Sequence, residues 1–391
     1  MRILHVSDCF LPRAGGIEVT VSDLMRQQSR AGHDVRLVTL TVERSSPDHE
    51  SAMRSAPAWA FDESGMWVMR PCGARLRQRF ALIRAALRVA ATEPVDVIHA
   101  HASTFSPLAF AMALGARRRR RAVPMIITVH SLWRRYTPLY RLADHLVRWS
   151  RLPIVWSAVS RSAADAVARA ARTALPVPVL PNGLDLKTWP RPDLHVAGEG
   201  LRLIAVMRLA ARKRPLALAR TLRRAARVLG ADHGMTATIV GDGPSRARLE
   251  RYLERHGMTG WVTVTGHLPR HEVADHLRRA DLFLAPASLE SFGIAALEAH
   301  AAGLPVIGRV GTGLTDYVRD GVDGRLVDSD RAMAAAIAVA VRERGAGRAW
   351  WVSEPAVEQF SWPVVMDRAE ELYAVAAARV PAPAATPVTA G

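Results

Sequence analysis

Glu-Ser-Phe-Gly-Ile-Ala-Ala-Leu-Glu, from Glu290 to Glu298, places two carboxylates around a short apolar segment that is typical of a helix. Serine and glycine just before a helix leave its first backbone N–H groups open, and an anion can dock there. Glu290 would repel that anion unless it faced hydroxyl groups, whereas Glu298 lies about two helical turns further on. A sugar nucleotide matches this spacing, with sugar hydroxyls, a diphosphate and ribose hydroxyls in sequence. A surface helix with two solvated glutamates fits the same residues, so the motif alone does not decide between them.

The bulk composition indicates a globular protein of two domains. The 391 residues are too many for one ordinary core, and 49% of them are hydrophobic while 23% are charged. The first residues read as a strand without the apolar region of a signal peptide, and no apolar run reaches the length of a membrane span. Cys9 and Cys72 have no metal-ligand spacing and fit a reducing compartment. We therefore expect a cytoplasmic protein.

The net charge of +17 raises the question of a polyanionic partner. Nucleic acid is not expected, because the basic residues are scattered, aromatics are only 6% and no nucleic-acid-binding motif is present. The densest basic run extends from Arg117 to Arg121, after an apolar helix-like segment. It fits a solvated helix end. It also fits a peripheral docking patch for anionic lipid at the inner face of the cell membrane.

Short apolar runs alternate with amphipathic segments along the whole chain, which predicts doubly wound parallel sheets of the α/β class. In the first half we expect strands at 3–6, 35–40, 95–99, 125–129 and 154–159, with helices at 19–31, 77–91, 107–116 and 163–171. After a proline-rich linker at 176–183, we expect strands at 201–206, 236–240, 262–265, 282–285 and 306–308, with helices at 215–229, 245–256, 272–279 and 292–302.

The domain prediction follows from this pattern. Residues 1–180 form a first Rossmann-like domain, residues 181–363 form a second, and their sheets face one another across a cleft. The helix at 364–378 packs back on the first domain, and residues 379–391 are a disordered tail rich in alanine and proline. Ligands of such sheets bind beyond the carboxyl ends of the strands.

Two candidate groups follow strands of the first half. Gly15 and Gly16 open a helix after the first strand, so their backbone can approach a phosphate closely; a tight turn explains them equally well. A histidine such as His130 is more often structural than catalytic, but its position at the carboxyl end of a strand shifts the balance towards function. Trp133 and the neighbouring arginines either bind an acceptor or form a rim.

The second half carries the remaining candidates at strand ends. Arg208 and Lys213 follow one strand and can converge on a diphosphate, although two exposed cations fit the same residues. Lys213 is one of only two lysines in a chain that otherwise uses arginine, which suggests a site for a compact ammonium group. Gly241 and Leu268 follow the next two strands and offer backbone and apolar surface to a base.

With these motifs in this order, nearly the whole chain resembles the retaining glycosyltransferases of the GT-B fold, family 4. That family includes bacterial phosphatidylinositol mannosyltransferases and the glucosaminyltransferase of mycothiol synthesis. The resemblance implies that His130 contacts the donor sugar and that Arg208 and Lys213 hold the diphosphate. It further implies that Glu290 binds sugar hydroxyls and Glu298 the ribose. The implied donor-binding set is completed by Gly15, Gly16, Gly241, Leu268, Phe292, Gly293 and Ile294.

The implied reaction moves a hexosyl unit from a nucleotide diphosphate sugar, GDP-mannose or a UDP-sugar, to an acceptor hydroxyl that can be lipid-linked. The resemblance implies retention of configuration, no metal and no cofactor. Met207 departs from the family, which usually has glycine before the Arg-Leu pair, and Ala295-Ala296 is smaller than usual. Two alternatives stay open, namely a nucleotide-sugar epimerase on the same fold and a non-catalytic basic protein that binds membranes or polyanions.

Overall fold

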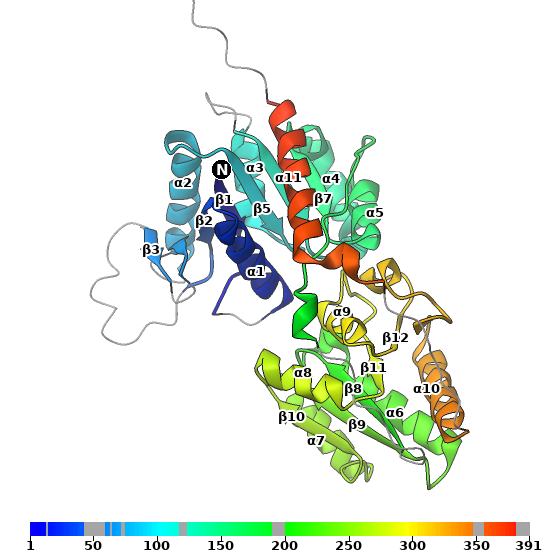
Figure 1. The fold of residues 1–391 in the computed structure, drawn as a ribbon. Helices are drawn as coiled ribbons and strands as arrows, with labels where there is room; N and C mark the ends of the chain where they lie inside the picture. Colours follow the sequence, from blue (N-terminus) through cyan, green and yellow to red (C-terminus); the bar gives the residue numbers. More distant parts are fainter. Residues whose placement is uncertain are drawn as a thin grey trace, which may run out of the picture. The chain divides into compact units, whose positions relative to one another are not determined.

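The computed structural model describes residues 1–12, 15–42, 59–62, 65–71, 75–116, 123–189, 200–346 and 356–380. The chain divides into two compact units (Figure 1). The N-terminal unit contains the chain up to Gly183 and again from Trp362, and the C-terminal unit runs from Leu184 to Ser361. None of the described helices combines the length and apolar character needed to cross a bilayer.

The N-terminal unit is built on a sheet with the strand order β3-β4-β2-β1-β5-β6-β7, in which β3 is antiparallel to β4 and the other neighbours are parallel. Its strands are β1 (Arg2–Ser7), β2 (Asp34–Thr39), β3 (Trp59–Phe61), β4 (Trp67–Met69), β5 (Val97–Ala102), β6 (Met125–Val129) and β7 (Val155–Ala158). Its helices are α1 (Gly16–Arg30), α2 (Leu76–Thr92), α3 (Pro107–Ala116), α4 (Thr137–Val147), α5 (Arg161–Ala170) and α11 (Trp362–Ala378). The predicted doubly wound architecture is confirmed.

The two faces of this sheet have different partners, because side chains alternate along each strand. Leu4, Val6 and Ile98 belong to a core that also contains residues of α2, α3 and α5. Ile3 and Val97 belong to a second core, with Leu24 of α1 and the inner side of α11. Helix α11, the last one in the described residues, therefore covers the sheet to which the first strand belongs (Figure 1).

The C-terminal unit has an all-parallel sheet with the strand order β10-β9-β8-β11-β12-β13. Its strands are β8 (Leu201–Val206), β9 (Met235–Val240), β10 (Val262–Gly266), β11 (Leu282–Leu284), β12 (Val306–Arg309) and β13 (Gly324–Val327). Its helices are α6 (Pro215–Leu229), α7 (Arg246–Arg255), α8 (Arg270–Arg278), α9 (Ile294–Ala301) and α10 (Asp330–Gly345). The short 3-10 helices of the two units are η3 (Arg134–Tyr136), η4 (Trp149–Arg151), η5 (Leu186–Thr188), η6 (Ala211–Lys213), η7 (Gly313–Asp316) and η8 (Glu358–Phe360).

The carboxyl ends of β8, β9 and β10 are tied together by their backbones. The N–H of Met207 donates to the carbonyl of Val240 over 3.0 Å, and the N–H of Gly241 donates to the carbonyl of Gly266 over 2.8 Å. Gly241 has a φ of +137°, and a Cβ there would lie 1.9 Å from the carbonyl oxygen of Met207. Met207, where the family usually has glycine, packs its side chain against the core. The close approach therefore depends on glycine at 241, not at 207.

Gly241→Ala should destabilise the C-terminal unit by about 3 kcal/mol, because the added methyl group meets a backbone oxygen and the residue needs a left-handed conformation. Gly260→Ala is the matched control, since a Cβ at Gly260 would meet no atom within 4 Å. Urea denaturation of both variants measures the difference. Equal free energies of unfolding for the two variants would show that the β8–β9 contact is not a constraint.

Candidate active site

The topology places a switch point in each sheet, where neighbouring strands lead to helices on opposite faces. In the C-terminal unit the switch lies between β8 and β11, and in the N-terminal unit between β1 and β5. Loops that leave such neighbouring strands diverge, so a ligand can bind between them at the carboxyl ends. The predicted site residues Lys213 and Glu290 follow β8 and β11, while Gly15 and Gly16 follow β1.

Lys213 and Glu290 form an ion pair at the C-terminal switch point, although they are far apart in sequence. Nζ of Lys213 donates to Oε2 of Glu290, and both side chains are largely shielded, with exposed fractions of 24% and 16%. This pairing joins the loop after β8 to the segment before α9. A cation and a carboxylate thus meet at one point, beside the N-terminus of a helix.

Arg214 anchors the loop that carries Lys213. It has a left-handed backbone, with a φ of +62°. Its guanidinium group forms a two-pronged ion pair with Asp330 at the start of α10, over 2.9 and 2.8 Å. It also donates to the carbonyl of Pro286, in the loop after β11, over 3.2 Å. The loops after β8 and β11 are therefore joined twice, by Lys213–Glu290 and by Arg214. The sequence did not identify Arg214, because it lies in an arginine-rich segment.

Gly293 shapes the entrance of α9. Its φ of +86° makes α9 begin at Ile294, two residues later than the predicted helix at 292–302. A Cβ on Gly293 would lie 3.3 Å from Cγ of Glu290 and 3.1 Å from the hydroxyl of Tyr317. That hydroxyl donates to the carbonyls of Phe292 and Gly293 over 3.2 and 2.9 Å, so the turn before the helix is fixed. Burial, with the nearby charge of Glu290, raises the pKa of Tyr317 well above its usual value and keeps it a donor.

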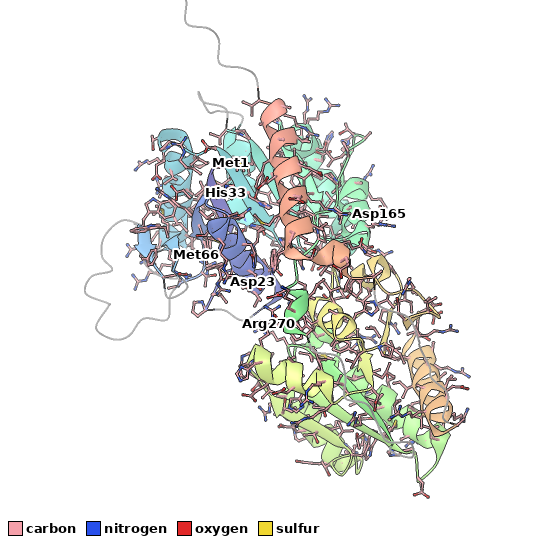
Figure 2. The ribbon with its side chains drawn as sticks, in the orientation of Figure 1. Met1, Asp23, His33, Met66, Asp165 and Arg270 are labelled. Atoms are coloured by element: carbon pink, nitrogen blue, oxygen red, sulfur yellow. The ribbon has the colours of Figure 1, made fainter. Side chains whose placement is uncertain are left out.

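Glu298 does not share the Lys213–Glu290 pair. Its carboxylate accepts a hydrogen bond from Arg270, the first residue of α8, over 3.1 Å. The same guanidinium group lies over the ring of Trp189, 5.2 Å from its centroid. Figure 2 labels Arg270 among the side chains of α8. The structure therefore gives Glu298 a cationic partner that the sequence had not suggested.

The other predicted residues of this unit occupy the adjacent loops. Arg208 is exposed after β8, Gly241 lies in the turn after β9, and Leu268 is half-buried between β10 and α8. Phe292 is buried and packs against Tyr317 and Phe360 rather than offering its ring to a ligand.

An Asp-x-Asp run, a spacing that can hold a metal ion, occurs at Asp328-Ser329-Asp330. The hydroxyl of Ser329 accepts the N–H of Ala332 over 3.1 Å and caps α10. Asp330 is paired with Arg214 and Arg309. The run therefore lies at the start of α10, and arginine side chains neutralise its second carboxylate, that of Asp330.

Gly15 and Gly16 stand at the start of α1, where Gly15 is the residue before the helix. A Cβ on Gly15 would lie 2.3 Å from a carboxylate oxygen of Glu18, whereas one on Gly16 would meet no atom within 4 Å. Glu18, which is buried in the first turn, folds its carboxylate back over Gly15, so a side chain at position 15 would have to displace it. The open side of Gly16 leaves room for a ligand.

His130 follows β6 and is buried, and its Nε2 lies 3.1 Å from Nδ1 of His101. Both histidines line a small hollow at the carboxyl end of the sheet, together with Thr20 and Asn182. Trp133 is fully buried and stacks on Tyr140 with ring centroids 3.9 Å apart, so it is a core residue and does not bind an acceptor. The run from Arg117 to Arg121 lies outside the described residues.

The structure adds three buried histidines that the sequence analysis missed. His5, His99 and His101 lie on the side of the sheet that α1 and α11 cover. Burial lowers the pKa of His5 and of His130 to about 4, and it lowers the pKa of His99 and His101 well below the usual value. The signal was present in the sequence as histidines in alternate positions of apolar strands.

Two doubly wound α/β units, each with a switch point at the carboxyl ends of its strands, are typical of the GT-B class. The family described as Glycosyltransferase Family 4 matches residues 14–188, and the family described as Glycosyl transferases group 1 matches residues 191–348. The chain therefore belongs to the family 4, group 1 glycosyltransferases, and the resemblance found in the sequence is confirmed.

Relatives of this chain include a D-inositol 3-phosphate glycosyltransferase of Frankia alni, which is 29% identical over 80% of this chain and 82% of its own length. A glycogen synthase of Mycobacterium tuberculosis is 28% identical over 96% of this chain and 95% of its own length. Among solved structures, sucrose-phosphate synthase of Thermosynechococcus elongatus is similar, with a TM-score of 0.75 at 18% identity over 97% of this chain and all of its own. HepE of Anabaena, in complex with UDP and glucose, has a TM-score of 0.71 at 17% identity, over 96% of this chain and 100% of its own.

The buried histidines predict an acid-sensitive N-terminal unit. Because their pKa values are lower in the folded state than the unfolded value near 6.5, the unfolded chain takes up more protons, and stability is lost as the pH falls from about 6.5 towards 4. Each histidine contributes a slope of about 1.4 kcal/mol per pH unit in this window. Burial raises the pKa of Asp8 to about 6, so this single carboxyl group has the opposite effect on stability as the pH falls.

Urea midpoints between pH 7 and 5, followed by fluorescence of the buried Trp133, Trp149 and Trp156, measure this loss. His271→Gln is the control, because His271 is 80% exposed and its removal should leave the pH dependence unchanged. A midpoint that stays constant across this range would contradict the prediction.

Proposed function

We propose that this glycosyltransferase moves a hexosyl unit from a nucleotide diphosphate sugar to an acceptor hydroxyl, with retention of configuration and without a metal or cofactor. The observation that carries the proposal is the Lys213–Glu290 pair at the N-terminus of α9. A diphosphate at the helix start competes with Glu290 for Lys213, and the carboxylate then turns to sugar hydroxyls. The complexes of HepE with UDP and glucose support a donor of this kind.

Each predicted residue has a role in this proposal. Lys213 and Arg208 hold the diphosphate, and the N–H groups of Ile294 and its neighbours add helix-dipole stabilisation. Glu290 binds the transferred sugar. Glu298 binds the ribose, and Arg270 orients its carboxylate. The proposed contacts of the remaining residues are the donor sugar for His130, the diphosphate for Gly15 and Gly16, and the base for Gly241 and Leu268.

The reaction needs no nucleophile from the protein. The bond between the anomeric carbon and the phosphate oxygen breaks, and the acceptor oxygen bonds to the same face of that carbon. The departing phosphate takes the proton of the acceptor hydroxyl. Lys213 and Arg208 stabilise the charge that develops on the leaving diphosphate, so catalysis rests on positioning and electrostatics.

Lys213→Met and Glu290→Gln should each reduce kcat/KM for the donor by about a hundredfold or more, because each removes a group aimed at developing charge or at the sugar. Thermal shifts with UDP, GDP, ADP and dTDP sugars identify the donor first, and initial rates with that donor then measure the effect. Lys187→Met is the matched control, since Lys187 is the other lysine and is exposed in η5. Full activity of both site variants would refute the proposed roles.

The same assay separates the alternatives. An epimerase converts the donor without any acceptor, and a non-catalytic polyanion binder shows no thermal shift with any sugar nucleotide. Activity that survives EDTA supports metal independence. A product with the anomeric configuration of the donor supports retention, and an inverted product would exclude the same-face mechanism.

For the acceptor, we propose a lipid-linked hydroxyl at an anionic membrane surface. The described residues add support through α4, whose core side carries Tyr140 and Asp144. Its outer side exposes Leu139, Leu142 and Leu146 by 50%, 56% and 70%. Exposed arginines flank this stripe at positions 134, 135, 141 and 148. An apolar stripe with cations at its border is the pattern of a helix that lies on anionic lipid.

Replacing Leu142 and Leu146 together by aspartate should abolish co-sedimentation with phosphatidylglycerol vesicles, because it removes the apolar stripe and adds negative charge. Val228→Asp is the control, since Val228 is 57% exposed on α6 of the other unit. Phosphatidylcholine vesicles should bind neither protein. Undiminished sedimentation of the double variant would exclude α4 as the membrane contact.

A further inference from the structure

The buried histidines belong to a larger hydrogen-bonded cluster, the histidine network, which we define as His130, His101, His5, Gln28, Tyr373, His99, Thr128 and Ser157. Its members come from α1, α11, the four neighbouring strands β1, β5, β6 and β7 of the N-terminal sheet and the loop after β6. All of them are buried, and the hydrogen bonds described for their side chains join them into one path. The path begins at His130, a predicted site residue, and ends at a backbone carbonyl.

The first half of the path leads from His130 to Gln28. Nε2 of His130 lies 3.1 Å from Nδ1 of His101, and Nε2 of His101 lies 2.9 Å from Nδ1 of His5. Nε2 of His5 lies 2.7 Å from the amide oxygen Oε1 of Gln28. Because an amide oxygen only accepts hydrogen bonds, Nε2 of His5 carries a proton.

The second half of the path leads from Gln28 to the sheet backbone. The amide nitrogen of Gln28 donates to the hydroxyl of Tyr373 over 2.7 Å, and that hydroxyl lies 2.9 Å from Nδ1 of His99. Nε2 of His99 lies 2.8 Å from the hydroxyl oxygen of Thr128, which lies 2.8 Å from that of Ser157. The hydroxyl of Ser157 donates to the carbonyl of Ile127 over 3.4 Å.

A single order of protons satisfies every bond of this path. A neutral imidazole has one donor and one acceptor nitrogen, and burial keeps these rings neutral. The proton on Nε2 of His5 leaves Nδ1 as an acceptor, so His101 donates from Nε2. Nδ1 of His101 is then an acceptor, so His130 also donates from Nε2. On the other side of Gln28, each group donates to the next one along the path: Tyr373 to His99, His99 to Thr128, and Thr128 to Ser157.

The reverse order is less favourable. Turning the Gln28 amide over would reverse every bond, and Ser157 would then donate to Thr128 instead of to Ile127. The carbonyl at the end cannot donate, so the reversed order has one fewer of the hydrogen bonds described for the network. One such bond corresponds to about a tenfold preference. The carbonyl of Ile127 therefore favours this direction of the path over its reverse.

We propose that the histidine network holds His130 in the tautomer with its proton on Nε2, so that Nδ1 can only accept a hydrogen bond. A sugar hydroxyl that reaches Nδ1 must then donate to it. Gln28, His5, His101 and Tyr373 are positioning residues in this assignment, and α11 takes part through Tyr373. The link to catalysis rests on the proposed function, whereas the tautomer itself does not.

A metal site is the competing explanation for these rings. Nitrogen atoms of His5, His99 and His101 lie within 4.8 Å of one another, as metal ligands could. However, every ring nitrogen of the three has a hydrogen-bond partner in the network. A metal ion would have to displace these bonds, so the observed geometry favours ordered protons over a metal.

Tyr373→Phe tests the assignment, because it cuts the path between Gln28 and the carbonyl of Ile127 and frees the Gln28 amide to turn over. Tyr140→Phe is the matched control, since it removes another buried hydroxyl of the same unit, one that donates to the carbonyl of Thr104. Two-bond 15N–1H correlation spectra of the full-length protein with labelled histidines report the tautomer of each ring. The His130→Asn variant identifies the signal of His130.

We expect His130 to be at least about nine-tenths the Nε2–H tautomer in the native protein and in Tyr140→Phe. In Tyr373→Phe it should become a mixture, and kcat/KM for the donor should fall severalfold compared with Tyr140→Phe. The Nδ1–H tautomer in the native protein would overturn the proposal, as would identical spectra for the two variants. If the native protein retains zinc through dialysis and His101→Asn does not, these histidines form a metal site and the proposal is wrong.

If the spectra agree with the assignment but no sugar nucleotide is turned over, the network stands and the proposed function fails. If turnover is found with the other tautomer, the function stands and the network assignment fails.

Discussion

The pairing of β8 with β11 is the constraint on which the C-terminal candidate site depends. Leu203 and Ile204 of β8 lie in register with Leu282 and Phe283 of β11, although many residues separate the two strands. This register brings the loops after both strands to one edge of the sheet. Lys213 meets Glu290 there, and Arg214 fixes the same edge through Asp330 and Pro286. The ion pairs are thus consequences of backbone pairing, and they in turn restrict how the loops move.

In the N-terminal unit, the sheet face that α1 and α11 cover has an apolar part and a polar, hydrogen-bonded part. Ile3, Val97, Ile126 and Val155 form an apolar layer near the amino ends of the strands. Further along, the same face carries histidine, threonine and serine. Polar groups are costly in a core unless they are hydrogen-bonded, and here both ring nitrogens of His5, His99 and His101 are hydrogen-bonded. Replacing one member by an apolar residue therefore leaves a neighbour without a partner, so the layer behaves as a unit.

The sequence predicted the elements with clear periodicity, including every strand of five or more residues. It missed β3 and β4, which have only three residues each, and also β13. It missed α10, whose many alanines give little contrast between two faces, and α4, which exposes leucines. The site residues were predicted one by one from their places after strands. Their partners Arg214, Arg270 and Tyr317 were not, because an ion pair or a capping hydroxyl depends on distances that no local pattern carries.

The position of α11 also affects the order in which the protein is made. Its residues from Trp362 to Ala376 complete the core over Ile3, Val97 and Ile126, yet they are synthesised after the whole of the C-terminal unit. The C-terminal unit, from Leu184 to Ser361, is synthesised entirely before that helix exists. During translation the second unit can therefore close first, while the first unit waits with one face of its sheet uncovered. A nascent chain that stalls before Trp362 presents this apolar face to chaperones or to other chains.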